Sequence, residues 1–233
     1  PFPVVVTSSS EAMNYEVARL YARDQFPVIA HPKFHLREVN KKIRIGYFSN
    51  DYFNHATAYL IAELFELHDR QQFEIFAFSF SPETHDEMQK RLKKNFDQFI
   101  DVSNMSDYEV AALSRHKEID IAVDLKGYTT GSRPGVFALG AAPLQINYLG
   151  YPGTMGAEFI DYIIADSVLI PKCNQQYFSE KIIYLKNSYQ VNDSKRQISE
   201  RKYSRSELGL PEDKFIFCCF NINFKILPTT LDL

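Results

Sequence analysis

Short apolar runs alternate with segments of helical spacing through the middle of the chain. Residues 119–125 are almost continuously apolar, which is typical of a strand buried on both faces of a parallel sheet. The pattern predicts strands at 42–48, 73–80, 99–102, 119–125, 144–149 and 162–165, and helices at 57–68, 87–96, 107–115 and 133–139. This alternation predicts an α/β fold: a Rossmann-like, doubly wound parallel sheet with right-handed crossovers.

The two ends of the chain have a different character. Residues 10–24 carry apolar side chains at helical spacing, with Ser10 as the expected N-cap, and an irregular connector follows at 26–40. Three elements are expected near the other end: a surface loop at 192–202, a helical turn at 204–208 and an apolar strand at 214–220. The predicted parts are an N-terminal helix and connector (1–40), a Rossmann-like domain (41–210) and the start of a further, truncated lobe (211–233).

Composition and charge exclude several classes of function. A formal net charge of −3 and a pI near 6.1 leave no electrostatic footprint of a nucleic-acid-binding protein. No segment approaches the roughly 18 apolar residues of a membrane span. The odd cysteine count indicates a reducing compartment, and the adjacent Cys218 and Cys219 are expected to be buried in the last strand. We therefore expect a cytoplasmic protein that binds neither nucleic acid nor membrane, with no metal site.

A polar loop after the first predicted strand is the first candidate site. It ends at His55, directly before a predicted helix, at the carboxyl edge where open α/β sheets bind ligands. A helix N-terminus favours a neutral imidazole, so His55 is a candidate general base. A helix-capping or solvent-facing histidine is the alternative interpretation.

Three further loops follow other strands. After residues 119–125, Lys126 and the glycines near it form a turn whose amides and cations suit a negatively charged group. After residues 144–149, a loop with three glycines and a proline can press its backbone against a sugar, or can simply close a sheet edge. Lys225 follows the last predicted strand, where its charge can offset that of a diphosphate. The candidate binding residues are Lys126, Gly127, Tyr128, Thr129, Leu149, Gly150, Tyr151, Pro152, Gly153, Thr154 and Lys225.

Taken together, these loops resemble one family. The matching segments are 45–51 with 54–57, 124–129, 147–154, 177–181, and 220–221 with 224–226. From about residue 42 to about 228 the chain resembles the catalytic region of the protein O-GlcNAc transferases, most closely the bacterial members. Gly140 and Ala141 depart from the family's Arg-Pro pair, and Ile222 stands where the family has Gln or Asn.

The resemblance implies the N-terminal lobe of a two-lobed GT-B glycosyltransferase. Such an enzyme moves GlcNAc from UDP-GlcNAc to Ser or Thr hydroxyls of proteins, with inversion and without a metal or cofactor. His55 would be its general base or active-site organiser, Lys225 would contact the diphosphate, and the loop from Leu149 would line the sugar and acceptor pocket. The second catalytic lobe and the tetratricopeptide repeats of the family are the expected partners, and both are missing here.

Three hypotheses remain open from the sequence. The chain is part of a glycosyltransferase, or it is a non-catalytic remnant or binding module of the same fold. The third hypothesis is a nucleotide-binding Rossmann protein of another class, such as an oxidoreductase. That class would need a dinucleotide fingerprint, which the sequence lacks.

Overall fold

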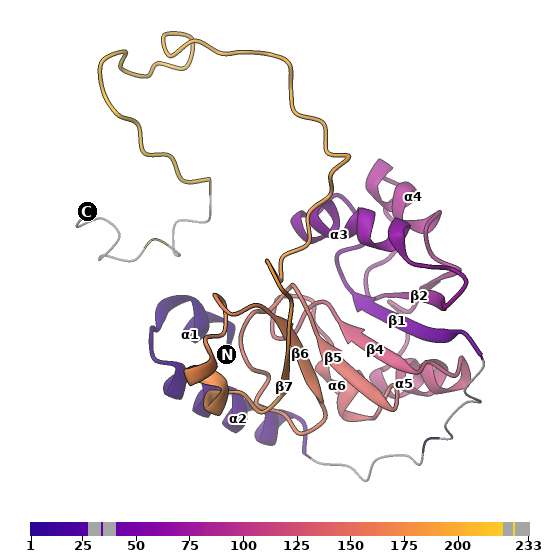
Figure 1. Cartoon of the computed structure of the whole chain (residues 1–233). Helices are drawn as coiled ribbons and strands as arrows, with labels where there is room; N and C mark the ends of the chain where they lie inside the picture. Colours follow the sequence, from indigo (N-terminus) through magenta and orange to yellow (C-terminus); the bar gives the residue numbers. More distant parts are fainter. Residues whose placement is uncertain (28–33, 35–40, 221–225, 227–233) are drawn as a thin grey trace. The chain divides into compact units, whose positions relative to one another are not determined.

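The chain separates into two compact units, residues 1–194 and residues 195–233 (Figure 1). The computed structural model describes residues 1–27, 34, 41–220 and 226. All regular secondary structure in the described ranges lies in the first unit. No helix in these ranges is long and apolar enough to cross a membrane.

A seven-stranded sheet forms the centre of the first unit, and every pair of neighbouring strands is parallel. The strand order is β3-β2-β1-β4-β5-β6-β7. Strands β2 and β3 are therefore added on one side of β1, and β4 to β7 on the other side, as in the predicted doubly wound fold. The strands are β1 (Ile43–Ser49), β2 (Phe73–Ser79), β3 (Gln98–Asp101), β4 (Ile121–Asp124), β5 (Leu144–Asn147), β6 (Tyr162–Ala165) and β7 (Lys181–Tyr184).

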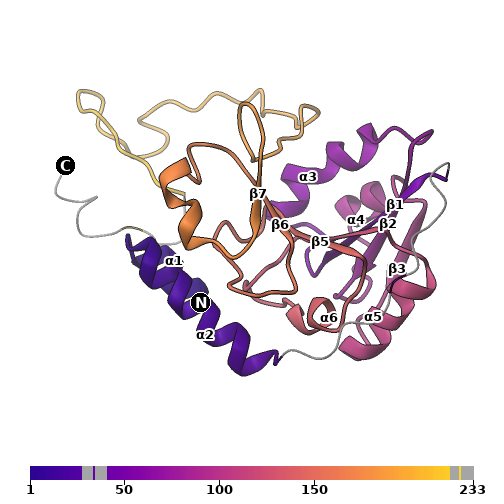
Figure 2. The ribbon, with the colours of Figure 1, turned by 60° about the horizontal axis from the view of Figure 1, so that its bottom comes forward.

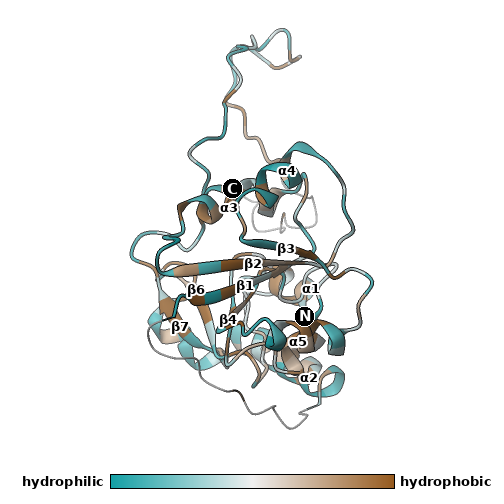
Figure 3. Cartoon of the chain, turned by 90° about the vertical axis from the view of Figure 1, so that its right-hand side faces the viewer, coloured by the Kyte–Doolittle hydropathy of each residue, from teal (hydrophilic) through white to brown (hydrophobic). Residues whose placement is uncertain are grey.

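Helices cover both faces of this sheet (Figure 2). One core joins the alternate strand residues Tyr47 and Ile75 to α3 and α4, and the other joins Phe48 and Phe76 to α2, α5 and α6. In Figure 3 the sheet lies between α3 and α4 on one side and α2 and α5 on the other, and hydrophobic and hydrophilic residues alternate along its strands. The helices are α1 (Phe2–Thr7), α2 (Glu11–Gln25), α3 (Ala56–Leu67), α4 (Glu87–Lys93), α5 (Asp107–His116) and α6 (Pro134–Ala138), with a 3₁₀ helix η1 (Lys172–Tyr177).

Local chemistry explains where several helices begin. Ser10 caps α2 as predicted, because its hydroxyl accepts a hydrogen bond from the Met13 amide. Ser106 and Glu109 form a reciprocal capping box at the start of α5. The observed bounds confirm the predicted helices and the six predicted strands between residues 42 and 165, with shifts of a few residues at their ends.

The predicted strand at 214–220 is wrong. These residues form no strand, Phe215, Phe217 and Phe220 are exposed, and so are both Cys218 and Cys219, which were expected to be buried. An apolar run becomes a strand only when its amides and carbonyls pair with a neighbour, and no described strand pairs with this one. The predicted turn at 204–208 is present, with Ser204 and Glu207 hydrogen-bonded to one another.

Three short elements were not predicted: α1, η1 and β7. The side chains of β7 alternate between exposed and half-buried, because β7 is the edge strand of the sheet. The helix η1 packs against α2. Each of the three has four to six residues, which is too short to give a clear hydrophobic period.

Candidate functional site

The loops that follow β1 and β4 meet at the point where the order of the sheet reverses. These two strands are hydrogen-bonded neighbours, with Phe48 opposite Asp124 near their carboxyl ends. Ligands of open α/β sheets bind outside the carboxyl ends at this switch point. The first two predicted loops, ending at His55 and starting at Lys126, therefore lie side by side.

His55 sits at the mouth of this site as the N-cap of α3. Its Nδ1 atom accepts a hydrogen bond of 3.2 Å from the Thr57 amide and lies 3.4 Å from Oδ2 of Asp51. The His55 side chain is 41% exposed, whereas that of Asp51 is 6% exposed. The imidazole is thus anchored at Nδ1 and accessible to a partner from solvent.

Lys126 joins the second loop to the first. Its ammonium lies 2.7 Å from Oδ2 of Asp51, and each of these side chains is only 6% exposed. A buried charge needs a partner of opposite charge, and the two residues satisfy this need for each other. Lys126 therefore holds Asp51, and its charge is directed inward to that carboxylate.

The turn that carries Lys126 is fixed by a buried carboxyl group. Oδ1 of Asp124 accepts hydrogen bonds from the amides of Lys126, at 2.8 Å, and Gly127, at 3.1 Å. Oδ2 of Asp124 has no hydrogen-bond partner among the described residues. Burial raises the pKa of Asp124 to about 6, although the two amides and the Lys126 charge oppose the shift.

The side chains of Tyr128 and Thr129 in this second loop make hydrogen bonds within the protein. Tyr128 is buried, and its hydroxyl donates to the Met155 carbonyl at 2.7 Å. The Thr129 hydroxyl donates to the Lys126 carbonyl at 2.8 Å. A Cβ added at Gly131 would lie 2.5 Å from Nδ2 of the Asn50 side chain, so the first and second loops are in close contact.

The third loop, residues 149–154, packs tightly on the second. Gly150 approaches β4 so closely that an added Cβ would lie 2.0 Å from the Leu125 carbonyl oxygen. The Asn147 side-chain amide donates to the Tyr151 carbonyl at 3.1 Å. Tyr151, Gly153 and Thr154 are buried, whereas Gly150 and Pro152 are half-buried. Of these, Gly150 and Pro152 offer the surface that a ligand can reach.

Glu180 secures the far end of this loop. It is buried, accepts hydrogen bonds from the Thr154 hydroxyl at 2.7 Å and the Met155 amide at 2.5 Å, and has a pKa raised by burial. Sequence reasoning assigned no role to Glu180 or to Asp51. The sequence did offer a signal for Asp51, because this carboxylate lies four residues before His55 in the same loop.

The fourth predicted loop, with Lys225, lies outside the described residues. Within the described ranges, no group of three or more His, Cys, Asp or Glu side chains is placed to hold a metal ion.

Sequence comparison assigns the chain to a family. The model of glycosyl transferase family 41 matches residues 23–203, which is well over half of the chain. The chain belongs to glycosyl transferase family 41. The predicted resemblance is confirmed, and an unrelated oxidoreductase or nucleotide binder is set aside.

Two curated relatives in family 41 illustrate the match. The chain is 36% identical over 98% of its length to SEC, a probable UDP-N-acetylglucosamine–peptide N-acetylglucosaminyltransferase from Arabidopsis thaliana. It is 30% identical over 82% of its length to the enzyme of that activity from Caenorhabditis elegans. The chain spans only 25% and 16% of these two relatives.

A solved family structure supports the fold. The O-GlcNAc transferase of Thermobaculum terrenum, solved as a mutant, superposes on 80% of this chain with a TM-score of 0.75 and 27% identity. The superposed part is 36% of that enzyme. The parallel sheet of this chain thus corresponds to part of a GT-B catalytic region, as expected from the sequence.

Proposed function

We propose that this chain is the N-terminal catalytic lobe of an inverting, metal-independent glycosyltransferase. The enzyme moves GlcNAc from UDP-GlcNAc to Ser and Thr hydroxyls of cytoplasmic proteins. One observation carries the proposal: in a chain of family 41, the exposed imidazole of His55 lies at the β1/β4 switch point, anchored beside the buried carboxylate of Asp51.

The proposed chemistry is a single displacement at the sugar. The acceptor hydroxyl oxygen bonds to the anomeric carbon while the bond from that carbon to the UDP oxygen breaks, and the electron pair leaves with UDP. Nε2 of His55 takes the hydroxyl proton. Lys225 is proposed to stabilise the departing diphosphate. Gly150 and Pro152 are the accessible part of the loop proposed to hold the sugar.

A complete site needs a second wall. The chain spans a quarter or less of the two relatives named above, so we propose that a second catalytic lobe and tetratricopeptide repeats act with it. A sugar nucleotide is held in a cleft that excludes water, and one lobe alone provides one side of such a cleft.

The experiment measures UDP release and peptide glycosylation from UDP-GlcNAc with a Ser/Thr-rich acceptor. The chain and its His55→Ala variant are each assayed alone and with the C-terminal catalytic lobe of a family 41 enzyme supplied in trans. We expect transfer with the supplied lobe, reduced at least about a hundredfold in His55→Ala. The matched control is His116→Ala, which changes a histidine outside the site.

A non-catalytic binding module is the second candidate. It is favoured by the Nδ1 hydrogen bond of His55, since capping α3 is a role that needs no catalysis. It is also favoured by Ile222, whose side chain cannot hydrogen-bond a nucleotide. UDP-GlcNAc binding without transfer in every combination, or equal rates for the chain and His55→Ala, would support this candidate and contradict the transferase.

A further inference from the structure

One carboxylate oxygen, Oδ2 of Asp51, faces two cationic or potentially cationic groups. It lies 2.7 Å from Nζ of Lys126 and 3.4 Å from Nδ1 of His55. The same Nδ1 atom lies 3.2 Å from the amide nitrogen of Thr57, which donates to it. The imidazole therefore has two competing partners at one nitrogen.

These two partners require opposite forms of the ring. The Thr57 amide is a donor, so it needs a lone pair on Nδ1 and places the proton of a neutral ring on Nε2. The Asp51 carboxylate is an acceptor, so it needs a proton on Nδ1 and leaves the lone pair on Nε2. Only in the second form does Nε2 carry the lone pair that can accept a proton from a substrate hydroxyl.

We propose that Asp51 is a positioning residue that selects the Nδ1–H tautomer of His55. This inference rests on the proposed function, because only a general base requires the lone pair on Nε2. In that tautomer the carboxylate, 3.4 Å from Nδ1, would accept the Nδ1 proton in place of the bond that the Thr57 amide donates. A hydrogen bond to a charged group is the stronger of the two kinds. Asp51 itself does not touch the substrate.

The surroundings hold Asp51 in one place. Its amide donates to the Ser49 hydroxyl at 3.0 Å, at the end of β1, and its carboxylate is paired with the buried ammonium of Lys126. Lys126 is in turn fixed by the turn that Asp124 closes. The tautomer of a histidine on the first loop thus depends on a lysine carried by the second loop.

The test measures the two neutral tautomers of His55 from ¹⁵N chemical shifts of its ring in the full 233-residue chain. We expect a substantial Nδ1–H population in the wild type and a roughly tenfold lower ratio of Nδ1–H to Nε2–H in Asp51→Asn. His68 is the internal control, since its Nε2 is bonded to the Tyr47 hydroxyl and its tautomer should not change. A wild-type ring that is entirely Nε2–H, or an unchanged ratio in Asp51→Asn, would overturn the proposal.

A second variant protects the test against misfolding. Asp51→Asn removes the carboxylate that pairs with the buried Lys126, which is a costly change. The double variant Asp51→Asn with Lys126→Met removes both charges, and we expect the same shift toward Nε2–H. An Nδ1–H preference that persists in a folded double variant contradicts a role for Asp51.

Failure of this inference is distinguishable from failure of the proposed function. The tautomer ratio is read without any transfer, so it decides the role of Asp51 even if the chain never glycosylates a peptide. In a transfer-competent assembly, we expect Asp51→Asn to lower kcat about tenfold or more with little change in the KM for UDP-GlcNAc. Transfer at the wild-type kcat in that variant would overturn the positioning role and leave the proposed function standing.

Discussion

The carboxyl group of Asp124 lies fully buried at the end of β4, where desolvation opposes its ionisation. Two backbone amides and the Lys126 charge favour the ionised form, but they do not offset the burial, and the pKa rises to about 6. In the unfolded chain an aspartate titrates near pH 3.9. Between about pH 4 and pH 6, the folded state therefore binds more protons at Asp124 than the unfolded state does.

A defined pH dependence follows for Asp124. The stability that this group contributes is fully present below about pH 4 and is lost as the pH rises through 6, a change of about 2 to 3 kcal/mol. We expect Asp124→Asn to remove this loss, so that its advantage over the wild type grows from pH 4 to pH 7. Urea unfolding of both proteins across that range provides the measurement. A difference between them that stays constant with pH would contradict the assignment.

Gly150 is a second residue whose role is set by its immediate neighbours. In Gly150→Ala the new methyl group would overlap the Leu125 carbonyl, a backbone atom that cannot move without disturbing β4. We expect a loss of about 2 kcal/mol in the free energy of unfolding, measured by thermal or urea denaturation. Gly153→Ala is the matched control, because its Cβ would meet side chains at 3.0 Å, and a smaller loss is expected. Equal losses would show that the Leu125 contact is unimportant.

Only part of the site was predictable at this scale. His55 was accessible to sequence reasoning because a histidine between a strand and a helix has a local signature. The pairing of Asp51 with Lys126 was not, because the two residues are 75 positions apart and meet only when β1 and β4 become neighbours. Lys126 was expected to face a ligand, but its ammonium points to Asp51 instead.

Whether a helix or strand could be predicted depended on how strong its local hydrophobic pattern is. The helix α3 was predictable, since Ala58, Ile61, Ala62 and Phe65 are spaced to face the sheet and are all buried. The edge strand β7 has too few residues and too little burial to give a pattern. The run at 214–220 has a strong strand pattern but no described partner strand. Its strand propensity alone therefore gave a wrong prediction.

Glu180 links two elements of the site, the loop at 149–154 and the segment that enters β7. Glu180→Ala would leave the Thr154 hydroxyl and the Met155 amide without their acceptor in a buried place. We expect a destabilisation of about 2 to 4 kcal/mol and faster hydrogen exchange at the Met155 amide. Glu180→Gln keeps an acceptor oxygen and serves as the control, with a smaller effect on both readouts. Unchanged exchange at Met155 in Glu180→Ala would refute this link.

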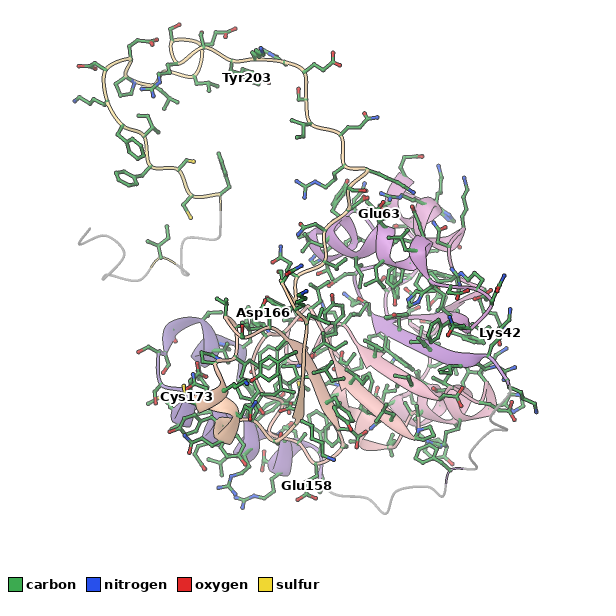
Figure 4. The ribbon with its side chains drawn as sticks, viewed as in Figure 1. Lys42, Glu63, Glu158, Asp166, Cys173 and Tyr203 are labelled. Atoms are coloured by element: carbon green, nitrogen blue, oxygen red, sulfur yellow. The ribbon has the colours of Figure 1, made fainter. Side chains whose placement is uncertain are left out.

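The first unit ends in a segment that is anchored to α3 and α4. The amide and hydroxyl of Ser194 donate to Glu63 on α3, which Figure 4 labels. The Asp193 carboxylate is paired with Arg91 on α4. From residue 196 to residue 209 every side chain is exposed. The boundary between the two units along the sequence therefore lies between residues 194 and 195.

Limited proteolysis tests this division. Among the sites between residues 43 and 220, we expect trypsin to cut first at Arg196, Arg201 or Lys202, where the backbone is exposed and outside regular structure. The fragment that ends there should remain folded, because the complete sheet lies before residue 194. Mass spectrometry of the early fragments gives the order of cleavage. First cuts between residues 43 and 184 would contradict this division into two units.

We propose that His55 of this lobe is the base that takes the proton of the acceptor hydroxyl in a family 41 transferase. A chimera tests it most directly: residues 41–194 of this chain replace the corresponding segment of the Thermobaculum terrenum enzyme, and the rate of GlcNAc transfer to a peptide is measured. We expect transfer by the chimera and a loss of at least about a hundredfold in its His55→Ala variant. A folded chimera that binds UDP-GlcNAc but transfers no faster than its His55→Ala variant would contradict the role of His55 as the base.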